Sequence, residues 1–165
     1  MFPASGGLTR NLAGSSNKVE QLQHVSLADG AMNTLVGINS GTMAATRGTH
    51  NTALGANAGT LASRTYSSVL AGAQAGEAMT LAGNVVGLGS GALQRAYAVF
   101  DTVVAGSQAG CVLQRASEDT LLGHRAGAQL GSALRTVAVG AYAGYRGTTF
   151  ADTTIVGARA GQDGR

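Results

Sequence analysis

The chain has 165 residues, enough for one domain with a modest hydrophobic core. A charged fraction of 12% beside a hydrophobic fraction of 44% excludes intrinsic disorder. The formal charge of +3 is spread along the chain, without the concentrated basic stripe that nucleic-acid binding requires, so we expect no nucleic-acid partner.

Residues 1–32 stand outside any repeat, and we interpret them as a capping or attachment segment. The start, MFPASGGLTRN, lacks the basic and then apolar pattern of a signal peptide, and no stretch approaches the roughly 20 apolar residues of a membrane span. The stretch SSNKVEQLQHVSLADG fits either a short helix that begins near Ser16 or an extended arm. It holds the only lysine, Lys18, beside Val19, Leu22 and Val25. We expect it to cap the first repeat, to attach the chain to another protein, or both.

Residues 33–165 repeat one phrase, for example NTALGANAG at 51–59 and DTVVAGSQAG at 101–110. The phrases align on a central glycine, here called the pivot. The first interval between pivots is 18 residues and the following six are 17 residues each. Such a fixed period predicts a stack of equivalent structural units. The pivots are Gly37, Gly55, Gly72, Gly89, Gly106, Gly123, Gly140 and Gly157.

The residues around each pivot predict β-structure. The third residue before every pivot is Thr or Val, and both are β-branched residues that favour strands. A 17-residue unit is too short for two packed helices, and its glycine content opposes helix formation. We therefore predict an all-β fold, a parallel β-solenoid of about eight 17-residue coils stacked about 4.8 Å apart. Glycine at the pivots is then explained by turns that need a positive φ, or by backbones that approach too closely for a Cβ atom.

The second residue before the pivot is also apolar, or glycine, in every unit. In a strand this position faces away from its two neighbours, so both faces of the strand are apolar and both need cover. One face can look into the coil, and the other needs a partner. This pattern predicts a homotrimer packed around a common axis.

The segments VAVGAYA (137–143) and TIVGARA (154–160) resemble the head repeats of trimeric autotransporter adhesins, which form a left-handed parallel β-roll. The spelling NTALGANAG is also similar to repeats in bacteriophage and large-virus fibre, spike and appendage proteins. The resemblance covers about residues 33–161 and implies a trimeric architecture rather than a ligand. The adhesins carry an export signal, a stalk and a membrane anchor that this sequence lacks, which favours the viral interpretation.

Two other solenoid classes fit less well. The hexapeptide β-helix of acyltransferases needs an aliphatic residue every six positions. The residues six places after the aliphatic position include Glu77, Gln94 and Gln162, so that pattern is absent. Ice-binding solenoids need threonine on every coil of one face, and here valine interrupts the threonine column in half of the coils.

No residue pattern points to catalysis, a cofactor or a metal site. His24, His50 and His124 lie far apart in the chain, and Cys111 occupies a turn position. Five residues before successive pivots lie Asn84, Asp101, Glu118, Arg135 and Asp152. Asp101 above Glu118 suggests a cation site, but Arg135 breaks the acidic run, and an alternating surface ladder explains the column without a metal.

The sequence therefore predicts a non-enzymatic structural protein of a virion, namely a fibre, spike or surface-decoration segment. Its expected partners are itself, other virion proteins through residues 1–32 and, if it also serves host attachment, a host surface molecule. We expect no cofactor, no metal and no membrane insertion. The expected location is the virion surface or an appendage. The alternative is the head of a bacterial trimeric autotransporter adhesin at the cell surface.

Overall fold

The computed structural model describes residues 25–27, 32–41 and 48–164. Over these residues the chain forms fifteen short strands in two sheets, and it has no helix. The nine-stranded sheet has the order β1-β2-β3-β5-β7-β9-β11-β13-β15. Its strands are β1 (Val25–Leu27), β2 (Thr34–Val36), β3 (Thr52–Leu54), β5 (Val69–Ala71), β7 (Val86–Leu88), β9 (Val103–Ala105), β11 (Thr120–Leu122), β13 (Val137–Val139) and β15 (Thr154–Val156).

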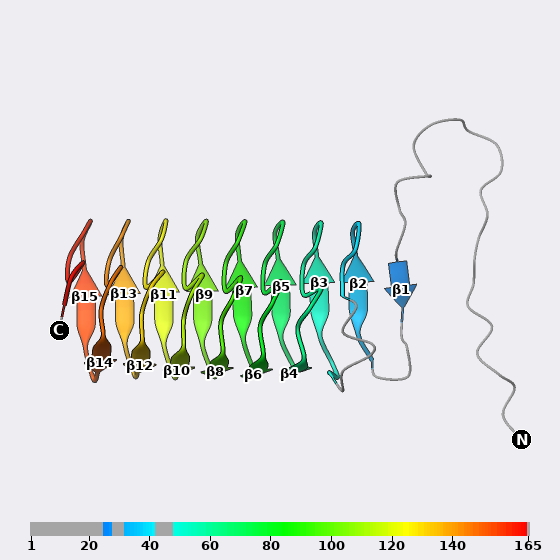
Figure 1. The fold of residues 1–165 in the computed structure, drawn as a ribbon, viewed down its shortest axis with the longest axis horizontal. Helices are drawn as coiled ribbons and strands as arrows, with labels where there is room; N and C mark the ends of the chain where they lie inside the picture. Colours follow the sequence, from blue (N-terminus) through cyan, green and yellow to red (C-terminus); the bar gives the residue numbers. More distant parts are fainter. Residues whose placement is uncertain (1–24, 28–31, 42–47, 165) are drawn as a thin grey trace, which may run out of the picture.

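The six-stranded sheet lies beside the first and completes each coil. Its order is β14-β12-β10-β8-β6-β4, and its strands are β4 (Arg64–Tyr66), β6 (Leu81–Gly83), β8 (Ala98–Phe100), β10 (Arg115–Ser117), β12 (Ser132–Leu134) and β14 (Thr149–Ala151). Figure 1 shows the coils stacked side by side along one axis, with β1 at one end and the C-terminus at the other. The predicted β-solenoid is confirmed, with about seven turns between β2 and β15.

Equivalent residues of successive coils stack directly on one another. Leu70 of β5, for example, pairs with Ala53 of β3 on one side and with Gly87 of β7 on the other. The same register holds along both sheets from coil to coil, and every pairing except that of β1 with β2 is parallel. A position in the 17-residue unit is therefore a column in the structure.

The core is a thin line of small and medium side chains inside the coil. The middle residue of each of the eight strands from β2 to β15 in the nine-stranded sheet is buried, from Leu35 in the first coil to Ile155 in the last, and the apolar side chains among them are at most 7% exposed. A column of alanines three residues after the pivot lines the same interior. Its buried members are Ala58, Ala75, Ala92, Ala109, Ala126 and Ala143. Of the two apolar strand faces, the one centred two residues before the pivot is thus the inner face.

The pivots meet both conditions expected of them. Their φ angles lie between +121° and +140°, a region that residues with a side chain rarely adopt. A Cβ atom added at any pivot from Gly37 to Gly140 would also lie only 2.2–2.7 Å from the backbone of the next pivot. At Gly157, the last pivot of the described chain, the nearest atom to an added Cβ is 3.7 Å away. The glycine column is where successive coils approach most closely.

Strand β1 lies antiparallel beside β2 and covers the outer edge of the first coil in the nine-stranded sheet. The rest of the N-terminal segment, residues 1–24 and 28–31, lies outside the described residues. The choice between a helix and an extended arm near Ser16 therefore falls outside them as well, and so does His24.

Candidate interaction surface

The outer face of the nine-stranded sheet forms a continuous uncharged surface along the described chain. It consists of two columns, three residues and one residue before each pivot, which we call the apolar strip. The strip has twelve aliphatic residues, four threonines and no charge. Its members are Thr34, Val36, Thr52, Leu54, Val69, Ala71, Val86, Leu88, Val103, Ala105, Thr120, Leu122, Val137, Val139, Thr154 and Val156.

The apolar strip is open to solvent in the single chain. Leu54 and Val103 are each 41% exposed and Leu88 is 39% exposed, and the other members are exposed or half-buried. Eight strands at about 4.8 Å spacing make the strip about 40 Å long, and with a width of about 10 Å its area is of the order of 400 Å². A contiguous apolar patch of this size typically marks a protein-protein or ligand interaction site.

The outer face of the six-stranded sheet has a different character. It mixes aromatic and aliphatic residues such as Tyr66 and Leu134 with exposed Arg64 and Arg115. Charged side chains are depleted from the centres of protein interfaces, so this face is the weaker candidate for a large dry contact. The apolar strip of the nine-stranded sheet is the stronger candidate for such a contact.

A charged and polar ladder borders the apolar strip on one side, five residues before each pivot. Arg135 binds both carboxylate oxygens of Asp152 one coil further on, through Nε at 2.5 Å and Nη2 at 2.9 Å. This contact raises the pKa of Arg135 and lowers the pKa of Asp152. In the same column Asn84 donates to Asp101 at 2.9 Å. The ladder thus gives the apolar strip a polar rim.

Between the rim and the strip lies a buried column of mainly polar residues, four places before each pivot, which we call the corner ladder. Five of its side chains accept the backbone N–H of the equivalent residue one coil on. Examples are the N–H of Asn51 bound to Asn33 Oδ1 at 2.9 Å and the N–H of Thr136 bound to Asp119 Oδ1 at 2.7 Å. These bonds hold the corner between the two strands of a coil. The corner ladder comprises Asn33, Asn51, Ser68, Val85, Thr102, Asp119, Thr136 and Thr153.

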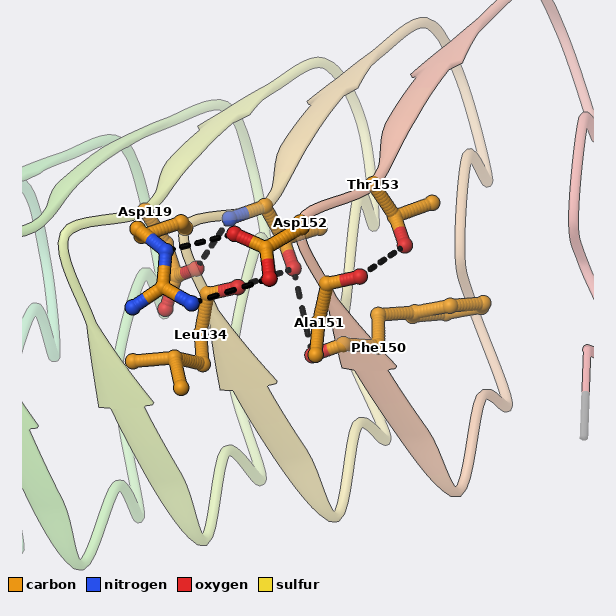
Figure 2. Close-up of polar contacts among 8 residues, drawn as sticks. Asp119, Leu134, Phe150, Ala151, Asp152 and Thr153 are labelled. Atoms are coloured by element: carbon orange, nitrogen blue, oxygen red, sulfur yellow. Dashed lines mark hydrogen bonds and ion pairs between the residues drawn. The ribbon is translucent and has the colours of Figure 1, made fainter.

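Asp119 is the irregular member of the corner ladder (Figure 2). Its side chain is buried, and its second oxygen, Oδ2, has no hydrogen-bond partner among the described residues. Burial raises the pKa of Asp119, although the hydrogen bond from the Thr136 N–H opposes this rise. In the same column Asn33 and Asn51 use their amide Nδ2 to donate to the Gly48 and Thr65 carbonyls at 2.9 and 2.6 Å. A charged carboxylate cannot make that bond.

His50, His124 and Cys111 lie in three different coils. No hydrogen bond or ion pair joins exposed His50 or His124 to an acid in the described part of the chain. Cys111 is half-buried, its Sγ lies 3.4 Å from the Ala128 carbonyl, and burial raises its thiol pKa, which opposes nucleophilic reactivity. Within residues 25–27, 32–41 and 48–164, no three metal-binding side chains converge.

The structure also brings together a group whose mutual contacts the sequence did not reveal, although Arg125 and Tyr142 lie in the column two residues after the pivot where the sequence places candidate ligand contacts. We call this group the ridge cluster. It occupies the turn after the pivot in the sixth and seventh coils and consists of His124, Arg125, Tyr142, Tyr145 and Arg146. The rings of His124 and Tyr142 meet edge to face with centroids 5.3 Å apart, as do Tyr142 and Tyr145 at 5.4 Å. The guanidinium carbon of Arg125 lies 5.8 Å from the Tyr142 ring centroid, and that of Arg146 lies 5.3 Å from the Tyr145 centroid.

None of the described residues forms a helix that could cross a membrane. Comparison with protein-family models, with curated proteins and with solved structures finds no match to this chain. The function proposed below is therefore inferred from the physical character of the surfaces.

Proposed function

We propose that this protein is a non-enzymatic structural rod, a segment of a virion fibre, spike or surface decoration, and that it works as a homotrimer. The observation that carries the proposal is the uncharged, solvent-open apolar strip that runs the length of the solenoid. The resemblance of the repeats to those of viral fibre and appendage proteins supplies the virion context. Residues 1–32 are the proposed attachment to other virion proteins, and host attachment is a proposed accompanying role.

Further copies of the same chain are the best occupants of the apolar strip. Its side chains repeat at the coil spacing of about 4.8 Å, and only a partner with the same spacing meets every coil in the same way. Parallel copies around a threefold axis keep the coils level with one another. Three strips of the order of 400 Å² would together bury about 1,200 Å² in the trimer, shared among its three pairwise contacts.

The test of the trimer is a mass measurement on two matched variants. We expect light scattering at micromolar concentration to give three times the chain mass of 16.3 kDa. Leu88→Glu, in the apolar strip, should dissociate the trimer because it places three carboxylates in an apolar contact. Leu134→Glu is the control, since Leu134 faces outward from the six-stranded sheet and is 37% exposed against 39% for Leu88.

A wild-type mass of one or two chains would refute the trimer, and equal dissociation by both glutamates would refute the assigned interface. The virion assignment is tested separately, by immunogold electron microscopy of purified virus particles with an antibody against the chain. Labelling on fibres, spikes or the particle surface is the expected result. Labelling of a bacterial cell surface instead would support the adhesin-head alternative.

A further inference from the structure

The outer ridge formed by the turn after the pivot has an uneven charge distribution. In the first five coils the column two residues after the pivot holds only neutral residues, such as Asn57 and Gln74. In the last three coils the same column reads Arg125, Tyr142 and Arg159. In this column, positive charge and aromatic area are thus concentrated at the end furthest from β1.

The backbone fixes the spacing of these side chains. Arg125, Tyr142 and Arg159 have φ angles of 55°, 59° and 60°, and consecutive members are joined through the ladder bonds Tyr142 N–H to His124 O at 2.8 Å and Arg159 N–H to Ala141 O at 2.8 Å. Each side chain therefore stands about one coil, about 4.8 Å, from the next. Tyr142 is held between two arginines by the register itself.

The guanidinium groups of the ridge cluster are positioned but not neutralised. Arg125 and Arg146 lie over the rings of Tyr142 and Tyr145, and Arg125 Nε also donates to Gln108 Oε1 at 2.6 Å. Neither they nor Arg159 form a salt bridge with an acid in the described part of the chain. A guanidinium that is stacked on a ring keeps N–H donors in its own plane, and these fit a carboxylate or sulfate with two parallel bonds.

We propose that the ridge cluster, together with Arg159, binds an acidic polysaccharide. Three arginines supply donors for the carboxylate or sulfate groups of successive sugars, and the tyrosine hydroxyls and the exposed Gln129 offer hydrogen bonds to sugar hydroxyls. The neighbouring acid is Asp163, one coil beyond Arg146 in the same column, and it leaves the patch with a net positive charge. The site lies in the turn after the pivot, outside the two columns of the apolar strip.

The packing of the rings favours a glycan over single-stranded nucleic acid. Proteins that bind single strands use open aromatic faces on which successive bases stack, along an extended cationic groove. Here the faces of Tyr142 and Tyr145 are in contact with guanidinium groups and neighbouring rings. The two arginines of the column two residues after the pivot, Arg125 and Arg159, also span only three coils.

Calorimetric titration of the full chain tests the proposal with four probes: heparin, polygalacturonate, neutral dextran and a thymidine oligonucleotide. We expect heparin or polygalacturonate to bind, with the two arms separating sulfate from carboxylate preference, and neutral dextran not to bind. The double variant Arg125→Gln/Arg146→Gln should weaken that binding at least tenfold. Its matched control is Arg64→Gln/Arg115→Gln, which removes two exposed arginines from the six-stranded sheet and should change affinity less than twofold.

Tyr142→Leu tests whether binding depends on the aromatic ring that positions Arg125 and not only on positive charge. It leaves the net charge unchanged but removes the ring beneath Arg125, and we expect a loss of at least fivefold. Thermal melts of each variant, followed by circular dichroism, check that the fold is retained. The proposal is overturned if neither acidic glycan binds, if both arginine pairs matter equally, if Tyr142→Leu has no effect, or if the oligonucleotide binds more tightly than either glycan.

Discussion

At the scale of single residues, asparagine, serine and threonine all satisfy the hydrogen bonds of the corner ladder, whereas aspartate does not. Asparagine satisfies the column with both of its polar atoms, as Asn51 does with the Ser68 N–H at 3.1 Å and the Thr65 carbonyl at 2.6 Å. Serine and threonine satisfy it with a single hydroxyl. Aspartate in its charged form supplies two acceptors where one acceptor and one donor are needed, and Asp119 leaves Oδ2 without a partner.

We predict that Asp119→Asn stabilises the protein at pH 7 by about 1–3 kcal/mol, because it removes a buried unsatisfied acceptor. The new amide can donate to the carbonyl of Ala133, which occupies the place that Thr65 has for Asn51. Thermal unfolding measures the change. The control is Asp101→Asn, on the exposed rim, where the remaining amide oxygen can still accept from Asn84, so a small change is expected.

The same variant has a predicted pH dependence. Burial raises the folded-state pKa of Asp119 above its ordinary value of 3.8, so the unfolded chain loses this proton first as the pH rises. The stability that the protonated acid contributes is complete below the unfolded pKa and is lost as the pH rises through the folded pKa. The advantage of Asp119→Asn should therefore be small near pH 3.5 and full at pH 7. An advantage that shrinks with rising pH would contradict this account.

At the scale of the coil, one core exchange links two positions that are six residues apart. The fourth coil alone has glycine at the inward strand position, Gly87, and it alone replaces the usual glycine four residues after the pivot, by Leu93. Leu93 is fully buried with a φ of 54°, and a Cβ atom added to Gly87 would lie 3.0 Å from its Cδ1. The leucine fills, from the opposite side of the coil, the space that an inward strand residue fills elsewhere.

A double-mutant cycle tests this exchange. Leu93→Gly leaves a cavity and should cost about 2–5 kcal/mol, less a gain of about 1 kcal/mol from relief of the positive φ. Gly87→Leu overpacks the same space and should cost about 1–3 kcal/mol. The double variant restores the usual pattern of the repeat and should melt above both single variants. Losses that simply add in the double variant would show that the two positions are independent.

The strands of the nine-stranded sheet were predictable from the sequence, because β-branched residues recur at a fixed distance from a glycine. The six-stranded sheet was predictable only as a second strand of unknown position. Its strands include Arg64–Tyr66 and Ser132–Leu134, which share no residue type in any column. Which strand face lies inside the coil was also not predictable, since both faces are apolar. The space inside the closed coil determines which face is buried, and that space is a property of the three-dimensional structure.

The ridge cluster was not predictable because its members come from two coils and from positions with no common residue type. Arg125 and Tyr142 stand among asparagine, glutamine and glycine in their column. Only the register of the coils places Tyr142 beside both Arg125 and Tyr145. Aligning the sequence at a period of 17 residues shows which side chains occupy neighbouring coils, and this alignment is how such groups can be found.

At the scale of the whole molecule, stability is the sum of coil terms and of contacts between adjacent coils. The two ends of the stack differ. At one end β1 covers the edge of β2 in the nine-stranded sheet. At the other, β15 has a neighbour on one side only in the described chain, and Val156 is 68% exposed. The first coil is thus protected from edge-to-edge pairing and the last described coil is not.

We predict that deletion of residues 1–32 leaves a β-rich trimer, since every remaining coil keeps its neighbours. Circular dichroism and light scattering measure both properties. The truncated protein should aggregate more readily, because the edge of β2 is then unpaired. If residues 1–32 attach the rod to the virion, the truncated trimer should also fail to enter particles. Normal incorporation would limit the segment to capping, and loss of the β-content would show that the coils need the segment to fold.

The glycine column has a consequence for how such a gene can change over generations. Each pivot from Gly37 to Gly140 lies against the backbone of the next, so a codon inserted or deleted within a strand or pivot turn moves the following side chains out of their columns. The one 18-residue coil, between Gly37 and Gly55, keeps the register of β2 with β3. Recombination between near-identical repeats adds or removes 17 codons and restores every contact at the junction. Lineages of this protein should therefore differ in length by whole coils. The length of the rod should therefore change in steps of about 4.8 Å, the spacing of neighbouring strands.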